Sequence, residues 1–535
     1  MIVAEDHEGD EHVRLFRVEL AHPGIMIPLS EDRPPYFLRG GQLSPDQHTL
    51  FYSMNYDLEH GATTEESLLY RHDLASGERT AIARSRRASW SPPELNSAGT
   101  HLLQMRVDRH PGGEQVHLID VEGGSDVEIL NAGDDRKVRA AWMPDGRNLL
   151  FVAEHADGTY QRVGRYDIVS GATDWLLDDP QIQVEAAWPT RDGLVVVDEV
   201  RAARHCAHII DPQTGARRLF SALPGNLQPL GQAPDGAWIA LHYSSTAPAD
   251  LLRISDDTTI VSLTRVQERM QIDPADLTPA EEFRWHSSDG LEIQGWLYRA
   301  AAPCDRAVLY IHGGPTWHSE EWINPQIQYL VRRGFHVLDV NYRGSTGFGL
   351  AYRESIKIDG WGGREQADIR CGAEALIAAG IAAPGKIGIT GTSYGGYSSW
   401  CQIVHTPPEV IAAAAPICGM TDLVIDYETT RPDLRPYSEE MIGGTPQQAP
   451  ERYFERSPIH FVQQIRGKLL IVQGAQDPNV TPENVHQVRV RLDAAGIPYE
   501  LLEFADEGHG IHRPTNQAIL YRRLAEFFEQ SLQKQ

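Results

Sequence analysis

The chain follows two different patterns of apolar and polar positions. Over about the first 280 residues, short apolar strands such as residues 149–153 alternate with turns that contain Pro, Asp and Gly. From residue 281 onward, apolar strands alternate with longer helical stretches such as the alanine-rich residues 364–379. The first pattern is typical of an all-β domain and the second of a mainly parallel sheet covered by helices. We therefore expect an all-β domain over residues 1–280 and an α/β domain over residues 281–535.

The predicted all-β domain contains a repeat of about 45 to 52 residues. Proline opens a strand in each copy, and between the prolines an apolar strand ends in an acidic residue and a turn. The prolines are Pro45, Pro92, Pro144, Pro189 and Pro234, and the acidic residues are Asp73, Asp120, Asp167 and Asp211, with weaker copies at Glu19 and Asp256. A strand-rich repeat of this length is the signature of a β-propeller. The acidic marks predict about six or seven blades, and a β-sandwich is the alternative.

A serine in the second domain lies in a suggestive context. Residues 391–396 read Gly-Thr-Ser-Tyr-Gly-Gly directly after an apolar strand at residues 386–390. Between a strand and a helix, the sequence G-x-S-x-G forms a sharp turn that exposes the serine hydroxyl, a nucleophile elbow. Ser393 is therefore the predicted nucleophile. A glycine-rich turn without chemistry is the alternative for the motif taken alone.

An activated serine needs a base and a carboxylate that orients the base, and both follow in the order found in α/β-hydrolases. Asp477 comes just after the apolar residues 469–473, and His509 lies in a glycine-flanked loop after residues 501–504. Open α/β sheets place their active sites beyond such strand ends. We predict that Asp477 orients His509 and that His509 acts as the base.

Simpler interpretations exist for each of these two residues. Asp477 precedes a proline and could only form a turn, and His509 could be an exposed loop histidine. Asp506 and Asp422 are alternative carboxylates, although Asp506 is too close to His509 in sequence to come from a separate strand end. Order, strand context and glycine flanks together favour the catalytic interpretation.

Two backbone amides are candidates for an oxyanion hole. The first is the N–H of Tyr394, which directly follows the predicted nucleophile. The second is the N–H of Gly314, because a predicted strand at residues 307–311 runs into His-Gly-Gly-Pro and Pro315 has no N–H to donate. A plain strand-to-loop turn is the alternative for this second segment.

Five motifs occur in a fixed order over residues 281–535. They are His-Gly-Gly-Pro at 312–315, Asn-Tyr-Arg-Gly-Ser-Thr-Gly-Phe-Gly at 341–349, Asp-Gly-Trp-Gly-Gly at 359–363, Gly-Thr-Ser-Tyr-Gly-Gly-Tyr at 391–397 and Gly-His-Gly at 508–510. Together they resemble the catalytic domain of the prolyl oligopeptidase family of serine peptidases, most closely its acylaminoacyl-peptidase branch. The resemblance implies a serine peptidase that hydrolyses short peptides through an acyl-enzyme, of the acylaminoacyl-peptidase or aminopeptidase and oligopeptidase type.

The resemblance also implies substrate contacts. Arg435 lies where acylaminoacyl peptidases are expected to hold a substrate carbonyl, and a solvated arginine is the alternative. Tyr397 and Trp400 are predicted to wall part of the acyl pocket. A dipeptidyl-peptidase activity would need a carboxylate pair in the propeller, for which Glu65 and Glu66 are a formal match.

Two other function classes remain open. An esterase or amidase acting on an acylated small molecule would use the same chemistry, because one fold hosts many substrates. A catalytically silent binding protein is disfavoured by the presence of Ser393, Asp477 and His509.

Composition adds further expectations. A formal net charge of −26 would repel nucleic acid phosphates and anionic lipids. The five cysteines are scattered and odd in number, which favours reduced thiols over disulfides or a zinc site. No apolar run is long enough to span a bilayer, and the acidic N-terminal residues lack an apolar signal region. We expect a cytoplasmic enzyme with no metal, cofactor, nucleic acid or membrane partner, and assembly into a homo-oligomer stays open.

Overall fold

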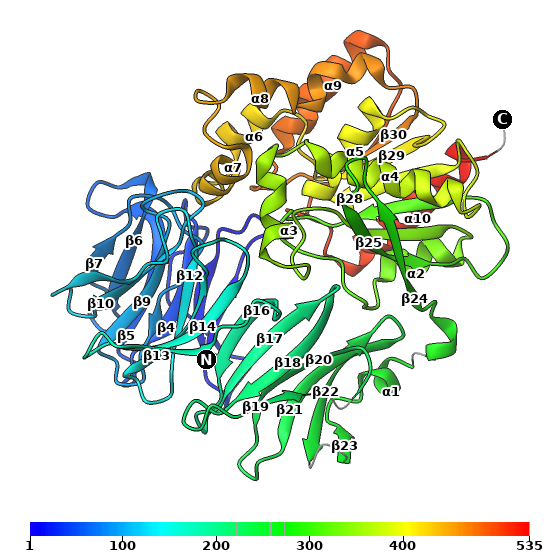
Figure 1. Cartoon of the computed structure of the whole chain (residues 1–535). Helices are drawn as coiled ribbons and strands as arrows, with labels where there is room; N and C mark the ends of the chain where they lie inside the picture. Colours follow the sequence, from blue (N-terminus) through cyan, green and yellow to red (C-terminus); the bar gives the residue numbers. More distant parts are fainter. Residues whose placement is uncertain (221–222, 256–258, 272, 534–535) are drawn as a thin grey trace. The chain divides into compact units, whose positions relative to one another are not determined.

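The computed structural model describes residues 1–220, 223–255, 259–271 and 273–533 (Figure 1). The chain forms two compact units. Unit 1 comprises Met1–Val197, Ile209–Arg218 and Arg431–Glu440, and unit 2 comprises Asp198–His208, Leu219–Thr430 and Met441–Gln535. The segment Arg431–Glu440 therefore joins the N-terminal part of the chain, although its neighbours in sequence belong to unit 2.

Among the residues that the structure describes, the N-terminal strands form six sheets, in each of which neighbouring strands are consecutive in the chain. The first sheet has three strands and the others have four. The strands are β1 (Ile2–Glu5), β2 (Arg14–Val18) and β3 (Met26–Pro28); β4 (Leu38–Leu43), β5 (Thr49–Asp57), β6 (Ala62–Asp73) and β7 (Arg79–Arg84); β8 (Glu94–Leu95), β9 (His101–Arg106), β10 (Gln115–Asp120) and β11 (Asp126–Leu130); β12 (Val138–Trp142), β13 (Asn148–Glu154), β14 (Gln161–Asp167) and β15 (Thr173–Leu177); β16 (Val184–Pro189), β17 (Val195–Arg201), β18 (Arg204–Ile210) and β19 (Arg217–Phe220); β20 (Asn226–Gln232), β21 (Trp238–Ser244), β22 (Ala247–Ser255) and β23 (Thr259–Ser262).

The acidic marks of the repeat have a common structural role. Asp73, Asp120 and Asp167 end the third strand of their sheets, and Asp211 directly follows the third strand of its sheet. Each carboxylate accepts a hydrogen bond from the backbone N–H two residues further on, at 2.8 to 2.9 Å. Aspartate stabilises a turn in this way, which explains why the mark recurs once per sheet. Asp256 lies outside the described residues.

The prolines follow the repeat less regularly. Pro45, Pro144 and Pro234 lie between the first and second strands of their sheets, and Pro189 ends the first strand β16. Pro92 instead precedes β8, which is only two residues long. Pro92 therefore does not occupy the position within its sheet that Pro45, Pro144 and Pro234 occupy in theirs.

The C-terminal strands form one mixed sheet of eight strands in the order β24-β25-β27-β26-β28-β29-β30-β31. From β27 onward in this order the neighbours are parallel, and β24 and β25 pair antiparallel at one edge. These strands are β24 (Ala280–His286), β25 (Glu292–Tyr298), β26 (Ala307–Ile311), β27 (His336–Asn341), β28 (Ile387–Thr392), β29 (Ala413–Ile417), β30 (Lys468–Gly474) and β31 (Glu500–Phe504).

Helices flank this sheet (Figure 1). One core combines α2 and α10 with strand residues such as Val308 and Val337, so these two helices cover one face together. The helices of the chain are α1 (Val266–Met270), α2 (Pro325–Arg332), α3 (Leu350–Glu354), α4 (Arg364–Ala378), α5 (Tyr394–His405), α6 (Leu423–Thr429), α7 (Arg435–Ile442), α8 (Pro450–Glu455), α9 (Pro482–Ala495) and α10 (Pro514–Ser531). Among the described residues, no helix is both long and apolar enough to cross a membrane.

The predicted fold class, a β-propeller followed by an α/β-hydrolase domain, is confirmed. The number of blades and a boundary at residue 280 stay predictions. The change from meander sheets to the mixed sheet falls between β23 and β24, whereas the compact unit 2 includes Asp198–His208 and starts its main segment at Leu219.

Candidate active site

Ser393 stands at the turn between β28 and α5, in a conformation that only a constrained backbone adopts. Its φ of 62° and ψ of −120° are rare for a residue with a side chain, and such strain is found at nucleophile elbows. The flanking glycines make the turn sterically possible. A Cβ on Gly391 would lie 2.3 Å from the carbonyl oxygen of Ile311, and a Cβ on Gly395 would lie 2.0 Å from the same atom. The motif therefore has glycine where β26 packs directly against the turn.

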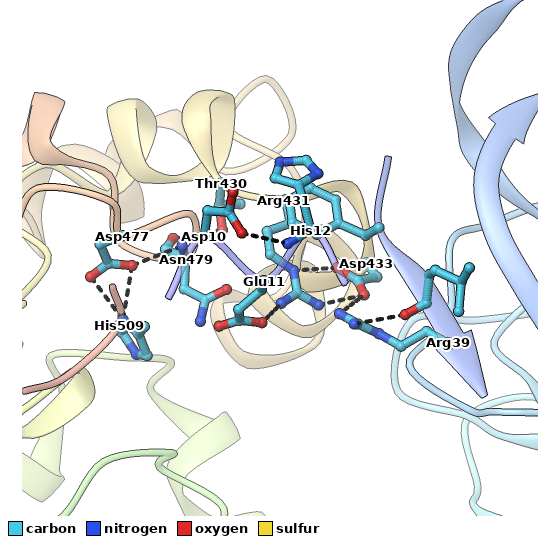
Figure 2. Close-up of polar contacts among 12 residues, drawn as sticks. Asp10, Glu11, His12, Arg39, Thr430, Arg431, Asp433, Asp477, Asn479 and His509 are labelled. Carbon is cyan, nitrogen blue, oxygen red and sulfur yellow. Dashed lines mark hydrogen bonds and ion pairs between the residues drawn. The ribbon is translucent and has the colours of Figure 1, made fainter. Parts of the chain in front are cut away.

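The register of the sheet brings Asp477 and His509 together. Gly474 at the end of β30 pairs with Phe504 at the end of β31, so the two loops that follow start side by side. Nδ1 of His509 lies 3.0 and 2.9 Å from the two carboxylate oxygens of Asp477 (Figure 2). An N–H at Nδ1 can thus donate to the carboxylate, which leaves Nε2 of the ring to accept a proton.

Asp477 is held firmly. Its side chain is fully buried, and Oδ1 accepts a hydrogen bond from the backbone N–H of Asn479 at 2.9 Å (Figure 2). The same oxygen accepts from the backbone N–H of Val480 at 3.0 Å. The side chain of His509, by contrast, is 20% exposed. A buried carboxylate with fixed donors and a partly open imidazole suit the roles of orienting group and base.

Glu507 is a positioning residue that the sequence did not reveal. It is buried, and its carboxylate accepts hydrogen bonds from the backbone N–H groups of His512 and Arg513, both at 3.0 Å. These bonds tie the loop that carries His509 to the start of α10. The only sequence signal is an acidic residue beside Gly508-His509, which is common on an acidic protein surface.

The rival carboxylates have other partners. Asp422 caps the N-terminus of α6, where its side chain accepts from the backbone of Val424 and Ile425. Asp506 accepts from Asn516 and pairs with Arg513 at 3.3 Å. Both contacts are of the kind that stabilises turns and helix ends.

The segment predicted to supply the second oxyanion donor also reaches Ser393. Ile311 at the end of β26 pairs with Gly391, so the glycine pair after β26 lies beside the elbow. A Cβ on Gly313 would lie 3.4 Å from the Cβ of Ser393 and 4.0 Å from its Oγ. Gly314 has a φ of +116°, and a Cβ there would contact Thr316 and Trp317. Of the two glycines, Gly313 is the one that leaves room at the hydroxyl of Ser393.

Contacts of His312 hold this segment in place. Burial lowers the pKa of His312 to about 3, so the ring is neutral. Its Nε2 lies 2.8 Å from the hydroxyl of Ser345, and its ring stacks on Tyr342 at 4.4 Å between centroids. The hydroxyl of Tyr342 donates to the carbonyl of His312 at 3.0 Å. The motif at 341–349 therefore accompanies the motif at 312–315 because its side chains hold that turn.

A pocket of about 480 Å³ in unit 2 adjoins these residues. Its lining includes Gly313, which lies close to Ser393 in space, and Thr392, which directly precedes Ser393 in the chain. The aromatic side chains of Trp317 and Trp322 and the carboxylate of Glu320 also line it. A mostly apolar cavity with a few polar groups beside a nucleophile is the usual form of a substrate site.

Three residues that the sequence suggested as substrate contacts have different surroundings. Arg435 belongs to unit 1, where its Nη1 lies 2.8 Å from Oε1 of Glu65. Tyr397 and Trp400 lie in α5 and are 0% and 1% exposed. The hydroxyl of Tyr397 donates to the carbonyl of Arg456. Contact between these two rings and a substrate stays a prediction that their burial does not favour.

Tyr394 lies at the first position of α5, as its predicted role requires. The first N–H groups of a helix have no partner within the helix, and they favour negative charge. Its side chain points away into the core, where the hydroxyl donates to Glu365 at 2.9 Å and the residue is fully buried. The role of the Tyr394 and Gly314 N–H groups as oxyanion donors stays a prediction.

Comparisons with known proteins find peptidases that are similar to this chain. Residues 322–535 match the model of the prolyl oligopeptidase family. Dipeptidyl aminopeptidase BIII of Pseudoxanthomonas mexicana is 26% identical over 549 residues, which cover 96% of this chain and 76% of that protein. Acylamino-acid-releasing enzyme of Arabidopsis thaliana is 28% identical over 234 residues, 42% of this chain and 30% of that enzyme. The structure of a puromycin-hydrolyzing peptidase of Mycobacterium tuberculosis superposes with a TM-score of 0.83 at 22% identity, covering 100% of this chain and 86% of that one.

Proposed function

Because the chain belongs to the prolyl oligopeptidase family of serine peptidases, we propose that it hydrolyses short peptides through an acyl-enzyme on Ser393. The observation that supports this most directly is the bidentate contact between His509 and the buried Asp477, on loops that leave adjacent strands. The strained backbone of Ser393 at the start of α5 supports it further.

The mechanism follows from these contacts. His509, held through Nδ1 by Asp477, takes the proton of the Ser393 hydroxyl as Oγ attacks the peptide carbonyl. The negative charge on the carbonyl oxygen is stabilised by the N–H of Tyr394 and by an N–H of the Gly313-Gly314 segment. Protonated His509 then gives its proton to the leaving amine. In the second half of the reaction His509 takes a proton from water, which attacks the acyl carbonyl, and the proton passes to Oγ of Ser393 as the acid leaves.

The type of peptide is a finer proposal. We propose release of one or two residues from the N-terminus of a short peptide, as an acylaminoacyl peptidase or an aminopeptidase. Named relatives include both a dipeptidyl aminopeptidase and an acylamino-acid-releasing enzyme, so the family does not decide between them. The pocket beside Gly313 and Thr392 is large enough for a single apolar side chain and its neighbour.

The setting of the enzyme is a further proposal. The five cysteines, among them the buried Cys401 and Cys418, are free thiols in the structure. Free thiols are usual in a reducing compartment, which supports a cytoplasmic location.

The nucleophile is tested by Ser393→Ala. We expect the variant to lose hydrolysis of a short chromogenic peptide and labelling by a fluorophosphonate, while its thermal unfolding stays unchanged. Ser76→Ala, which alters an exposed turn of unit 1, should keep both signals. Labelling that persists in Ser393→Ala would reject the assignment.

A substrate panel separates the remaining function classes. Acetyl-aminoacyl, free aminoacyl, dipeptidyl and simple ester chromogenic substrates would be compared by kcat/KM. Preference for either N-blocked or free peptides over esters supports the peptidase. A ratio that strongly favours the ester would support the esterase or amidase alternative instead.

A further inference from the structure

A buried cluster in unit 2 has the composition of a metal site. His205 lies on β18, and His318 and Glu320 lie in the loop between β26 and α2. Their ligand atoms are all within 4.8 Å of one another, and both histidines are buried. We infer that His205, His318 and Glu320 bind a divalent transition-metal ion, with Zn²⁺ as the best match. Two histidines and one carboxylate are a common protein ligand set for Zn²⁺.

The spacing of the ligand atoms fits a tetrahedral ion. Oε1 of Glu320 lies 3.4 Å from Nε2 of His205 and 3.6 Å from Nε2 of His318. Two ligands bound to Zn²⁺ at about 2.0–2.1 Å in tetrahedral geometry are about 3.3 Å apart. Two of the three distances between ligand atoms therefore already have nearly the required length, and the third, between the two imidazoles, is at most 4.8 Å.

A polar contact at Nδ1 orients each of the two imidazoles. Nδ1 of His205 lies 2.9 Å from Oδ2 of Asp198, and Nδ1 of His318 lies 2.6 Å from the hydroxyl of Thr346. Metal-binding histidines are almost always held in this way, with the second ring nitrogen bonded to a carboxylate or another acceptor. The contacts leave Nε2 of both rings facing Glu320.

One of these nitrogens points to a missing ligand. Nε2 of His318 is buried and has no hydrogen-bond partner among the described residues, and the side chain is only 4% exposed. A buried polar atom without a partner is costly, and a bound cation would satisfy it.

The carboxylate of Glu320 is oriented as well. Its Oε2 accepts a hydrogen bond from the hydroxyl of Tyr243, which leaves Oε1 facing Nε2 of both histidines.

The test is metal binding by the purified full-length chain after treatment with a chelator. Titration with Co²⁺ should give the visible absorption of a tetrahedral site at one equivalent, and Zn²⁺ should remove it. His318→Gln and Glu320→Gln should each weaken Co²⁺ binding by about tenfold or more. Glu320→Gln keeps the shape of the side chain, so it remains informative if a histidine variant fails to fold.

A second group provides the matched control. Asp57, Glu59 and His60 also lie close together, but Glu59 and His60 are exposed. His60→Gln should leave the Co²⁺ spectrum unchanged. Absence of the spectrum in the unmodified chain, or the same spectrum in His318→Gln and Glu320→Gln, would overturn the inference and leave His205 as one member of a buried ion pair. His318 and Glu320 also line the pocket beside Gly313 and Thr392, so the Co²⁺ titration is carried out without substrate, and the peptidase is tested separately through Ser393.

Discussion

Arg435 forms an ion pair with Glu65 in unit 1, with 2.8 Å between Nη1 and Oε1. The two residues are expected to bind different kinds of substrate. Arg435 is the expected partner of a substrate carbonyl in an acylaminoacyl peptidase, and Glu65 is half of the pair that a dipeptidyl peptidase would use for a free amine. The side chain of Arg435 is 24% exposed and that of Glu65 is 65% exposed. Water therefore reaches the ion pair, and either side chain can leave it to bind a substrate.

We expect Arg435→Ala to lower kcat/KM for acetyl-aminoacyl substrates about tenfold or more, because a hydrogen bond from a charged donor contributes about 1.5–3 kcal/mol. The free energy of unfolding should change by less than about 1 kcal/mol, as for other exposed ion pairs. Steady-state kinetics and thermal unfolding measure the two effects.

Glu65→Gln is the matched control, because it breaks the ion pair but keeps the guanidinium group. It should leave kcat/KM for acetyl-aminoacyl substrates within about twofold of the unmodified chain. If Glu65→Gln instead selectively weakened dipeptidyl substrates while Arg435→Ala did not affect blocked ones, the dipeptidyl-peptidase alternative would replace our proposal.

Asp477→Asn tests the orienting carboxylate. An amide in place of the carboxylate favours the wrong tautomer of His509 and does not stabilise its protonated form, so kcat should fall about 10⁴-fold with little change in KM. Reaction with a fluorophosphonate should slow in parallel. Single-turnover kinetics on a short peptide would show whether acylation is the affected step.

Asp422 provides a close comparison, because it was a rival for the same role. It caps α6, so Asp422→Asn keeps most of the capping function and should leave kcat unchanged. Should Asp422→Asn and Asp477→Asn reduce kcat equally, the contact between Asp477 and His509 would not be the catalytic one.

The sequence revealed the parts of the site that local rules determine. Ser393, Asp477 and His509 each follow an apolar strand, and the strands of the sheet end where the pattern predicts, within two residues. The sequence also predicted the sharp turn from the glycines around Ser393. Glycine is required there because a side chain would collide with Ile311. Such features depend on residues that are neighbours in the chain or in the next strand.

Other features depend on partners that are far apart in sequence. His205 and Glu320 are separated by 115 residues, and Arg431 and Glu11 by 420. Spacing along the chain contains no signal for such pairs, which is why the sequence did not indicate the cluster of His205, His318 and Glu320 and placed Arg431–Glu440 with the α/β domain. The sequence also does not show how deeply a side chain is buried. Aromatic residues near a nucleophile suggest the wall of a pocket, yet Tyr397 and Trp400 are enclosed.

Gly313 gives a prediction about space at the nucleophile. A Cβ at this position would lie 3.1 Å from the carbonyl of Thr392 and 3.4 Å from the Cβ of Ser393. Gly313→Ala should therefore fold but displace the substrate carbonyl, and kcat/KM should fall on the order of 10²-fold, the cost of moving reacting groups by about an ångström. Peptide hydrolysis and thermal unfolding would be measured together.

The control for this variant is Gly231→Ala, because a Cβ there meets no atom within 4 Å. It should have unchanged kcat/KM. A Gly313→Ala variant with full activity would show that the segment after β26 does not come near the substrate.

Arg431 is the most buried cation of the segment that joins unit 1. Its guanidinium group bonds Asp433 at 2.9 and 2.7 Å and pairs with Glu11 (Figure 2). It also lies 4.7 Å from the ring of Phe37 and 4.2 Å from that of Trp90. Arg431→Met removes the charge and leaves buried carboxylates without it. We expect a loss of about 3–5 kcal/mol in the free energy of unfolding of unit 1, the scale for breaking a buried ion pair.

Chemical unfolding followed by tryptophan fluorescence would measure this loss, since Trp90 lies in the cluster. Arg435→Ala serves as the comparison, because its ion pair is partly exposed and its removal should have a small effect. Equal effects of the two variants would mean that burial does not strengthen the contribution of Arg431.

Asp426 links stability to pH. It is buried in α6, and burial together with the charge of Asp477 raises the pKa of its carboxyl group from 3.8 to about 8. A group with a raised pKa binds its proton more tightly in the folded state, so its contribution is complete below pH 3.8 and is lost as the pH rises toward about 8. Through this group the free energy of unfolding falls by up to about 1.4 kcal/mol per pH unit.

Asp426→Asn should remove that decline, because an amide does not titrate. The variant should gain stability relative to the unmodified chain as the pH rises from about 5 to about 8, which urea unfolding at several pH values would show. Asp73→Asn provides the contrast. The pKa of Asp73 is lowered by hydrogen bonds from Ser76 and Ala75, so this group titrates below that interval and its substitution should leave the slope unchanged. If Asp426→Asn has the same slope as the unmodified chain, Asp426 is ionised in the folded protein and a counter-charge must compensate for its burial.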